Sequence, residues 1–147
     1  MMNEHSLPEL GWPAGDHFKS SDEAQSSSWL RLMFVREKGE DLFLGLAIPR
    51  AWLAEGKGAA IERAPSWFGP LSLRIETRAG GAEMRAALDP PSRNAPRTIY
   101  LRLRHPQRKP MRSVTVGGKD HAGFDPSKEW AVLPGALAGR TEVIARF

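Results

Sequence analysis

The chain of 147 residues contains no cysteine. A protein without cysteine has no disulfide framework, no thiolate nucleophile and no cysteine-ligated zinc or iron–sulfur site. No apolar run approaches the roughly 18 residues that a membrane-spanning helix needs. The opening residues MMNEHSLPEL also lack the basic and apolar segments of a signal peptide. From the sequence as written we therefore expect a cytosolic protein with no membrane partner.

Motifs typical of catalysis and of cofactor binding are also missing. The sequence has no Gly-x-Ser-x-Gly elbow, no P-loop and no Gly-x-Gly-x-x-Gly pattern. No two of the four histidines have the spacing of a local metal site. We therefore predict no catalytic residue, no metal and no cofactor. His105 should hydrogen-bond within a turn beside Pro106, and Asp120 with His121 is the weaker metal-site alternative.

Glycine and proline are abundant, with 14 and 12 residues, while hydrophobic residues make up an ordinary 41%. Frequent turn formers favour short strands over long helices. The segment Thr98–His105 alternates apolar with polar residues, which is the pattern of a strand with one buried face. We predict that it forms a hairpin with the segment 111–120, in which Gly117 and Gly118 supply a tight turn.

Similar patterns predict further short strands along the chain. They cover residues 29–36, 41–48, 58–63, 71–77, 83–88, 130–133 and 139–147. Lys38 and Gly39 are typical of a hairpin corner, Gly80 and Gly81 of the turn in a second hairpin, and Pro49–Gly56 has the signals of one short helical turn. We predict an all-β protein, an antiparallel β-sandwich of jelly-roll or immunoglobulin-like type with about nine strands. Residues 1–27 should form a flexible N-terminal arm, and residues 28–147 the sandwich domain.

Charge is unevenly distributed along the chain. Residues 1–42 carry 4 Lys and Arg against 8 Asp and Glu, whereas residues 43–147 carry 17 against 9. A basic face of Arg102, Arg104, Arg108 and Arg112, together with Tyr100, could attract a polyanion. The competing interpretation, which we favour, is a set of solvated arginines on the wet face of strands. Nucleic acid is therefore not the favoured partner.

Five segments carry a resemblance to a known family. They are WLRLMFVRE at 29–37, IPRAWLAEGK at 48–57, APSWFGP at 64–70, LRLRHP at 101–106 and VTVGGK at 114–119. Together they resemble the C-terminal β-sandwich domain of large bacterial glycoside-hydrolase-like proteins whose catalytic part is an (α/α)6 toroid. The resemblance covers residues 28–147. Gly117 stands where such domains have asparagine, which keeps the positive φ but removes a side-chain amide.

The resemblance implies a noncatalytic accessory module. The acid and base carboxylates of that family belong to the toroid, so no catalytic residue is carried over to these positions. The implied partners are a catalytic glycoside-hydrolase domain, which the module would stabilise or dock, and carbohydrate. The partner should pack on an exposed apolar patch, which a homodimer could occupy in the isolated protein, and family relatives could be exported. The alternative function is a small polyanion-binding or nucleic-acid-binding β domain that uses the arginine-rich face.

Aromatic residues are the remaining candidates for contact with carbohydrate or a partner. We single out Trp52, Trp67, Phe68 and Tyr100, because exposed rings can stack on the apolar face of a sugar. The competing interpretation, which we favour for Trp52 and Trp67, is that they plug the ends of the sandwich.

The carboxylates give little indication of catalysis. Glu37, Glu40 and Asp41 should form a solvated hairpin tip. Glu62, Glu76 and Glu83 should point outward from their strands into water. A general acid needs a carboxyl group shielded from water, so these positions do not favour catalysis.

Overall fold

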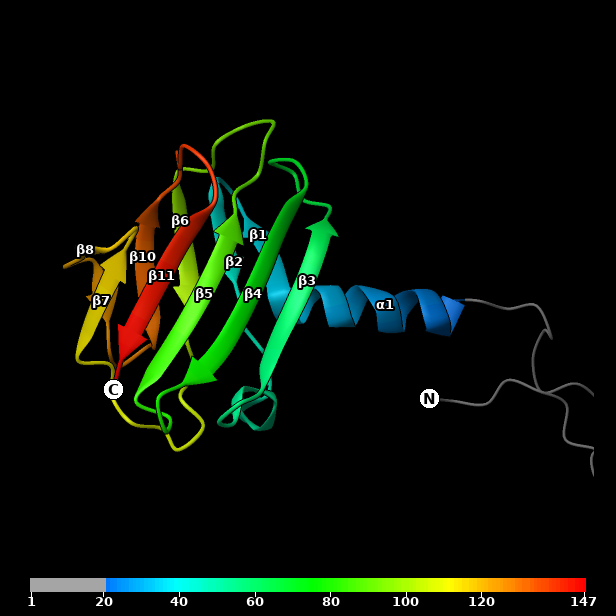
Figure 1. Ribbon diagram of the computed structural model, residues 1–147. Helices are drawn as coiled ribbons and strands as arrows, with labels where there is room; N and C mark the ends of the chain where they lie inside the picture. Colours follow the sequence, from blue (N-terminus) through cyan, green and yellow to red (C-terminus); the bar gives the residue numbers. More distant parts are fainter. Residues whose placement is uncertain (1–20) are drawn as a thin grey trace, which may run out of the picture. The chain divides into compact units, whose positions relative to one another are not determined.

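The computed structural model describes residues 21–147, with side chains from residue 24 onward. The chain divides into two units, Met1–Leu30 and Arg31–Phe147. Every strand among the described residues belongs to the second unit, which is a β-sandwich of two facing sheets (Figure 1). The predicted fold class is therefore confirmed. The boundary that we predicted between arm and sandwich domain stays a prediction, and residues 1–20 of that arm lie outside the described residues.

One sheet has five strands in the order β1-β2-β6-β10-β9. Its strands are β1 (Val35–Lys38), β2 (Asp41–Leu44), β6 (Thr98–Arg102), β9 (Phe124–Asp125) and β10 (Trp130–Pro134). The other sheet has six strands in the order β3-β4-β5-β11-β7-β8. Its strands are β3 (Gly58–Ala64), β4 (Leu71–Arg78), β5 (Glu83–Asp89), β7 (Ser113–Val116), β8 (Lys119–Asp120) and β11 (Thr141–Arg146). Figure 1 shows the six-stranded sheet in front of β1, β2, β6 and β10.

The core lies between the sheets and is formed by the apolar residues that alternate with polar ones along the strands. In β4 the apolar residues Leu71, Leu73 and Ile75 are buried, and in β6 so are Ile99 and Leu101. Because successive side chains of a strand point to opposite faces, the residues between them point outward. Each such buried side chain contributes about 1.5–3 kcal/mol through removal of apolar surface from water. The outward phase is therefore where a functional surface has to be sought.

Three of the predicted turns are confirmed. β1 pairs with β2 around Gly39, β4 with β5 around Gly80 and Gly81, and β7 with β8 around Gly117 and Gly118. All five glycines have positive φ, a conformation that side chains with a Cβ rarely adopt. The predicted helical turn is also present as the 3-10 helix η2 (Arg50–Leu53).

The predicted strand at 29–36 is wrong over most of its length. Residues Ser21–Phe34 form the helix α1, and strand β1 begins only at Val35. The helix begins with Ser21-Asp22-Glu23, residue types that favour helix N-termini, and Leu30–Met33 are good helix formers. Short apolar runs of this kind fit a strand or a helix equally well.

The predicted hairpin between 98–105 and 111–120 is also wrong. β6 lies in the five-stranded sheet and β7 in the six-stranded sheet, so residues 103–112 cross from one layer to the other. Buried His105 holds this crossing, because its Nε2 donates a 2.7 Å hydrogen bond to the carbonyl of Gly81. Its Nδ1 accepts a 3.1 Å hydrogen bond from Gln107 N, so the predicted hydrogen bond within a turn is confirmed.

The sheets differ from the prediction in two further respects. β2 and β6 pair in parallel, with Phe43 opposite Tyr100, whereas every other pairing of the described strands is antiparallel. The two-residue strand β9 was not predicted, because two residues carry no detectable alternation, whereas the equally short β8 follows the predicted turn at Gly117 and Gly118.

Candidate functional site

The outward face of the five-stranded sheet carries a cluster of partly exposed aromatic side chains. Phe43 of β2, Tyr100 of β6 and Trp130 of β10 all point away from the core. They come from three neighbouring strands, and the register places Phe43 opposite Tyr100. We call these three residues the aromatic cluster.

The aromatic cluster is packed through its own rings. The rings of Phe43 and Tyr100 stack with centroids 4.8 Å apart and planes 10° apart. Trp130 is almost equidistant from the two rings, at 5.7 and 5.8 Å, and stands at 71° and 73° to them. Trp130 therefore lies along the edges of the stacked pair. Such contacts are worth about 0.5–1.5 kcal/mol each beyond burial.

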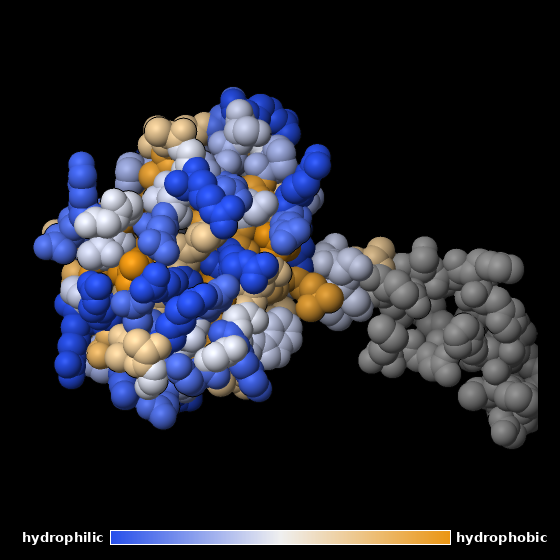
Figure 2. Space-filling view, in the orientation of Figure 1, coloured by the Kyte–Doolittle hydropathy of each residue, from blue (hydrophilic) through white to orange (hydrophobic). Residues whose placement is uncertain are grey.

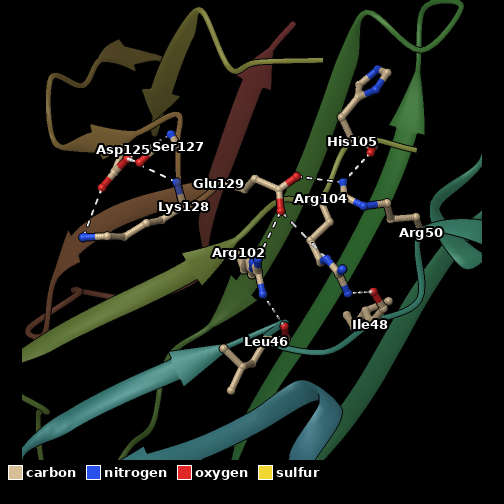
Figure 3. A network of polar contacts seen from close by, with 10 residues as sticks. All are labelled: Leu46, Ile48, Arg50, Arg102, Arg104, His105, Asp125, Ser127, Lys128 and Glu129. Carbon is tan, nitrogen blue, oxygen red and sulfur yellow. Dashed lines mark hydrogen bonds and ion pairs between the residues drawn. The ribbon is translucent and has the colours of Figure 1, made fainter. Parts of the chain in front are cut away.

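A group of charged residues, drawn in Figure 3, lies at one end of the five-stranded sheet. Arg102 lies opposite Trp130 in the β6–β10 register, and Arg104 follows two residues later. Their guanidinium groups surround the carboxylate of Glu129, together with that of Arg50 from η2. We call Arg50, Arg102, Arg104 and Glu129 the arginine cluster.

Glu129 is the centre of the arginine cluster. Its carboxylate lies 2.7 Å from Arg50 Nη1, 3.3 Å from Arg102 Nη2 and 3.9 Å from Arg104 Nε. Its backbone has a φ of 61°, in the left-handed region that non-glycine residues rarely adopt. The surrounding contacts hold Glu129 in this conformation, and strained residues of this kind concentrate at functional sites.

Backbone carbonyls take up part of the donor capacity of the arginines. Arg102 Nη1 donates to Leu46 O and Arg104 Nη1 to Ile48 O, both at 3.0 Å, and Arg50 Nη1 donates to His105 O at 2.6 Å. The Nε atoms of Arg102 and Arg104 are buried and have no hydrogen-bond partner among the described residues. Burial lowers the pKa of Arg104 from its ordinary value, and the charges of Arg102 and Arg50 lower this pKa further.

The outward face of the six-stranded sheet is different in character. Figure 2 shows this face, over which hydrophilic residues predominate. Oppositely charged side chains alternate there: Glu76 pairs with Arg78 at 2.7 Å and with Arg74 at 3.6 Å. An open groove of about 670 Å³ runs beside these pairs along β3 and β4, with Lys57 and Glu55 on its wall. Interleaved charges on an open surface are typical of a solvated face.

The predicted aromatic contacts do not form one surface. Trp52 lies in η2, just before β3 begins, whereas Trp67 and Phe68 follow the end of β3. At the rise of about 3.3 Å per residue in an extended strand, the length of β3 separates them by about 20 Å. Trp67 is 66% exposed, which contradicts its interpretation as a plug, and Trp52 is 43% exposed. Phe68 packs against the core instead. Of the four, only Tyr100 belongs to the aromatic cluster.

The predicted basic face is divided. Arg102 and Arg104 are half-buried in the arginine cluster, with 28% and 24% of their side chains exposed, so they are not freely solvated. Arg108 and Arg112 are exposed and lie in the segment that crosses between the sheets. Arg108 adopts a left-handed φ of 59° in that segment.

The carboxylates at the β1–β2 turn are not all solvated as predicted. Glu37 has a side chain only 5% exposed and pairs with Arg31 at 2.6 Å, while Asp41 pairs with Arg97 at 2.6 Å. Only Glu40 is largely exposed, at 78%. Glu37 also accepts a hydrogen bond from Trp67 N at 3.1 Å and thereby anchors the loop before β4.

The other carboxylates do not converge. Glu62 is exposed on β3, Glu76 is paired within β4, and the partly buried Glu83 of β5 pairs with Arg85 at 2.5 Å.

No group of histidines and carboxylates within residues 21–147 could hold a metal ion. His121 Nε2 donates instead to Val132 O at 2.8 Å. Within the same part of the chain, no helix combines the length and apolar character needed to cross a membrane.

Sequence reasoning missed Phe43, Trp130, Arg50 and Glu129. Phe43 and Trp130 could have been found from the sequence, because each alternates along its strand with buried neighbours and is therefore expected to point outward. Arg50 and Glu129 have no local signal, since their role depends on contacts between distant segments. Neither a family model nor a curated protein sequence matches the chain.

Proposed function

We propose that this protein is a noncatalytic accessory β-sandwich module of the glycoside-hydrolase type, and that its five-stranded sheet contacts carbohydrate. The observation that carries the proposal is the aromatic cluster, three mutually packed and partly exposed rings on the outward face of one sheet. Aromatic rings supply the apolar surface against which the C–H groups of a sugar pack. The resemblance of residues 28–147 to accessory sandwich domains supports the same role.

The aromatic cluster is better suited to this role than the other exposed rings. Trp52 and Trp67 lie at opposite ends of β3, neither packs against another ring among the described residues, and a single ring contacts only one sugar unit. Phe43, Tyr100 and Trp130 span three adjacent strands, and strands within a sheet are about 4.8 Å apart. A surface of that width can contact consecutive sugar units of a chain.

A docking role toward a catalytic domain forms the second part of the proposal. Exposed large apolar side chains favour contact with a partner surface, and Trp29 and Leu30 of the first unit are 62% and 53% exposed. The family resemblance suggests a catalytic glycoside-hydrolase domain as that partner.

A glycan-array screen of the purified protein at low and high salt, with DNA included, tests the carbohydrate role. We expect a glycan to bind at both salt concentrations, because ring contacts are not screened by ions. Binding should be lost in Trp130→Ala and retained in Trp52→Ala, the matched control. Binding of DNA alone, falling steeply with salt, would support the polyanion alternative instead. Binding of no glycan would refute the carbohydrate role.

A further inference from the structure

The arginine cluster carries more positive charge than negative charge. Arg50, Arg102 and Arg104 contribute three positive charges, and Glu129 contributes one negative charge. All four side chains are at least two-thirds buried, with exposed fractions of 21%, 28%, 24% and 14%. Holding unbalanced charges away from water is costly unless a counter-ion is supplied. We propose that the arginine cluster binds an oxyanion, the carboxylate of an acidic sugar.

The donors needed for such a ligand are present and unused. Arg104 hydrogen-bonds through Nη1 to Ile48 O, and Arg50 contacts His105 O and Glu129 through Nη1, so the Nη2 group of each has no partner among the described residues. The Nε atoms of Arg102 and Arg104 also lack a hydrogen-bond partner among the described residues, but both are fully buried, so a ligand would contact the Nη2 groups instead. A guanidinium group presents its N–H donors in a planar fork that matches the two oxygens of a carboxylate. A ligand carboxylate can therefore take up donors that the protein itself leaves free.

The cluster is also held in place before any ligand binds. Three backbone carbonyls, those of Leu46, Ile48 and His105, each accept a hydrogen bond from one arginine. Figure 3 shows these contacts around Glu129. Fixed donors lose little conformational entropy when a ligand binds, which raises affinity. Glu129 reduces repulsion among the arginines while leaving their charge in excess.

The position of the aromatic cluster indicates a sugar as the carrier of the carboxylate. Trp130 directly follows Glu129, and the Arg102 guanidinium lies 5.7 Å from the Trp130 ring centroid. The choice of carrier rests on the proposed function, whereas the oxyanion site itself rests on the arginine cluster alone.

Side-chain NMR of the arginine Nε–H groups tests this inference. The full chain is titrated with sodium glucuronate, with glucose as the neutral counterpart and with inorganic phosphate as the other source of an oxyanion. We expect saturable shifts of the Arg102 and Arg104 signals with glucuronate and none with glucose. Arg104→Gln should weaken glucuronate binding at least about tenfold, because the substitution removes the positive charge and with it the charge-assisted hydrogen bond to the ligand. Arg112→Gln, at an exposed arginine outside the cluster, should bind as the original protein does.

The outcomes separate this inference from the proposed function. No saturable shift with either anion would overturn the oxyanion site, even if the array showed a bound neutral glycan. Saturation by phosphate at lower concentrations than glucuronate would overturn the sugar carboxylate as the ligand. Binding of glucuronate without any bound polysaccharide on the array would support the site and refute the broader carbohydrate role. If Arg104→Gln does not fold, Arg104→Lys, which keeps the charge but removes the fork, replaces it.

Discussion

Arg102 and Trp130 face one another across the β6–β10 pairing, with the guanidinium carbon 5.7 Å from the ring centroid. This contact joins the aromatic cluster to the arginine cluster, because Arg102 also pairs with Glu129 at 3.3 Å. A cation over an aromatic ring is worth about 0.5–2 kcal/mol, depending on how far it is removed from water. The two clusters therefore form one continuous surface, and a change at Trp130 should also alter the position of Arg102.

Glu129→Gln should destabilise the protein. The substitution removes the only carboxylate that contacts Arg50, Arg102 and Arg104 in the described structure, and leaves three half-buried cations facing one another. We expect the free energy of unfolding to fall by about 1–3 kcal/mol, measured by urea denaturation.

Glu142→Gln is the matched control for Glu129→Gln. Glu142 is 53% exposed and lies 3.9 Å from Arg85, so its removal should change the free energy of unfolding by less than about 0.5 kcal/mol. Adding Arg104→Gln to Glu129→Gln should restore part of the loss, because it removes one of the repelling charges. Equal losses in the two glutamate variants would contradict the central role of Glu129.

The stacked pair of Phe43 and Tyr100 should show energetic coupling. A double-mutant cycle with Phe43→Leu and Tyr100→Leu, measured by urea denaturation, should give a coupling of about 0.5–1.5 kcal/mol. The contact joins parallel strands of the five-stranded sheet, with ring centroids 4.8 Å apart. A second cycle with Phe43→Leu and Trp67→Leu should give no coupling, and a coupling there as large as the first would show that the effect is not specific to the stack.

Alternation along strands was sufficient to predict most of the sandwich. In β4 the residues Leu71, Leu73, Ile75 and Thr77 are buried and their neighbours are not, because one face of the sheet packs on the core. Alternation reports that a face is buried but not which strands are paired. For that reason the predicted hairpin between β6 and β7 was wrong. The chain between these strands passes from one sheet to the other near the buried His105.

The candidate site could be predicted only in part. Tyr100, Arg102 and Arg104 lie on one outward face of a clearly alternating segment, so the sequence alone identified them. The residues that complete the site come from segments separated in sequence, such as Phe43 on β2 and Glu129 just before β10. The parallel pairing of β2 with β6 brings Phe43 to Tyr100, and no local pattern encodes that pairing.

Stability should decrease in acid through Glu76 and Asp125. A hydrogen bond from Arg78 lowers the pKa of Glu76, and one from Ser127 lowers the pKa of Asp125. A carboxylate whose pKa is lower in the folded than in the unfolded chain contributes its full stabilisation above the unfolded-state pKa. That contribution is lost as the pH falls through the folded-state pKa.

Urea denaturation at a series of acidic pH values measures this loss. Glu76→Gln should reduce the dependence of stability on pH in that window, by a small amount because the side chain is partly exposed and its charge is screened by water. Glu62→Gln, at an exposed residue of β3, serves as the control. A pH dependence that is the same in Glu76→Gln as in the original protein would contradict the assignment.

The register that brings Tyr100 and Arg102 beside β10 depends on Gly135. Pro134 at the end of β10 pairs with Thr98 at the start of β6, and a Cβ added at Gly135 would lie 1.6 Å from the carbonyl oxygen of Pro96. Backbone atoms cannot move aside as a flexible side chain can, so Gly135→Ala should lower the free energy of unfolding by about 3 kcal/mol or more. Gly139→Ala is the matched control, because no atom lies within 4 Å of its added Cβ, and a change within about 0.5–1 kcal/mol is expected. Urea denaturation of both variants measures the two losses of unfolding free energy. Equal losses would show that the β10–β11 connection tolerates no substitution in general, and would contradict a steric clash specific to Gly135.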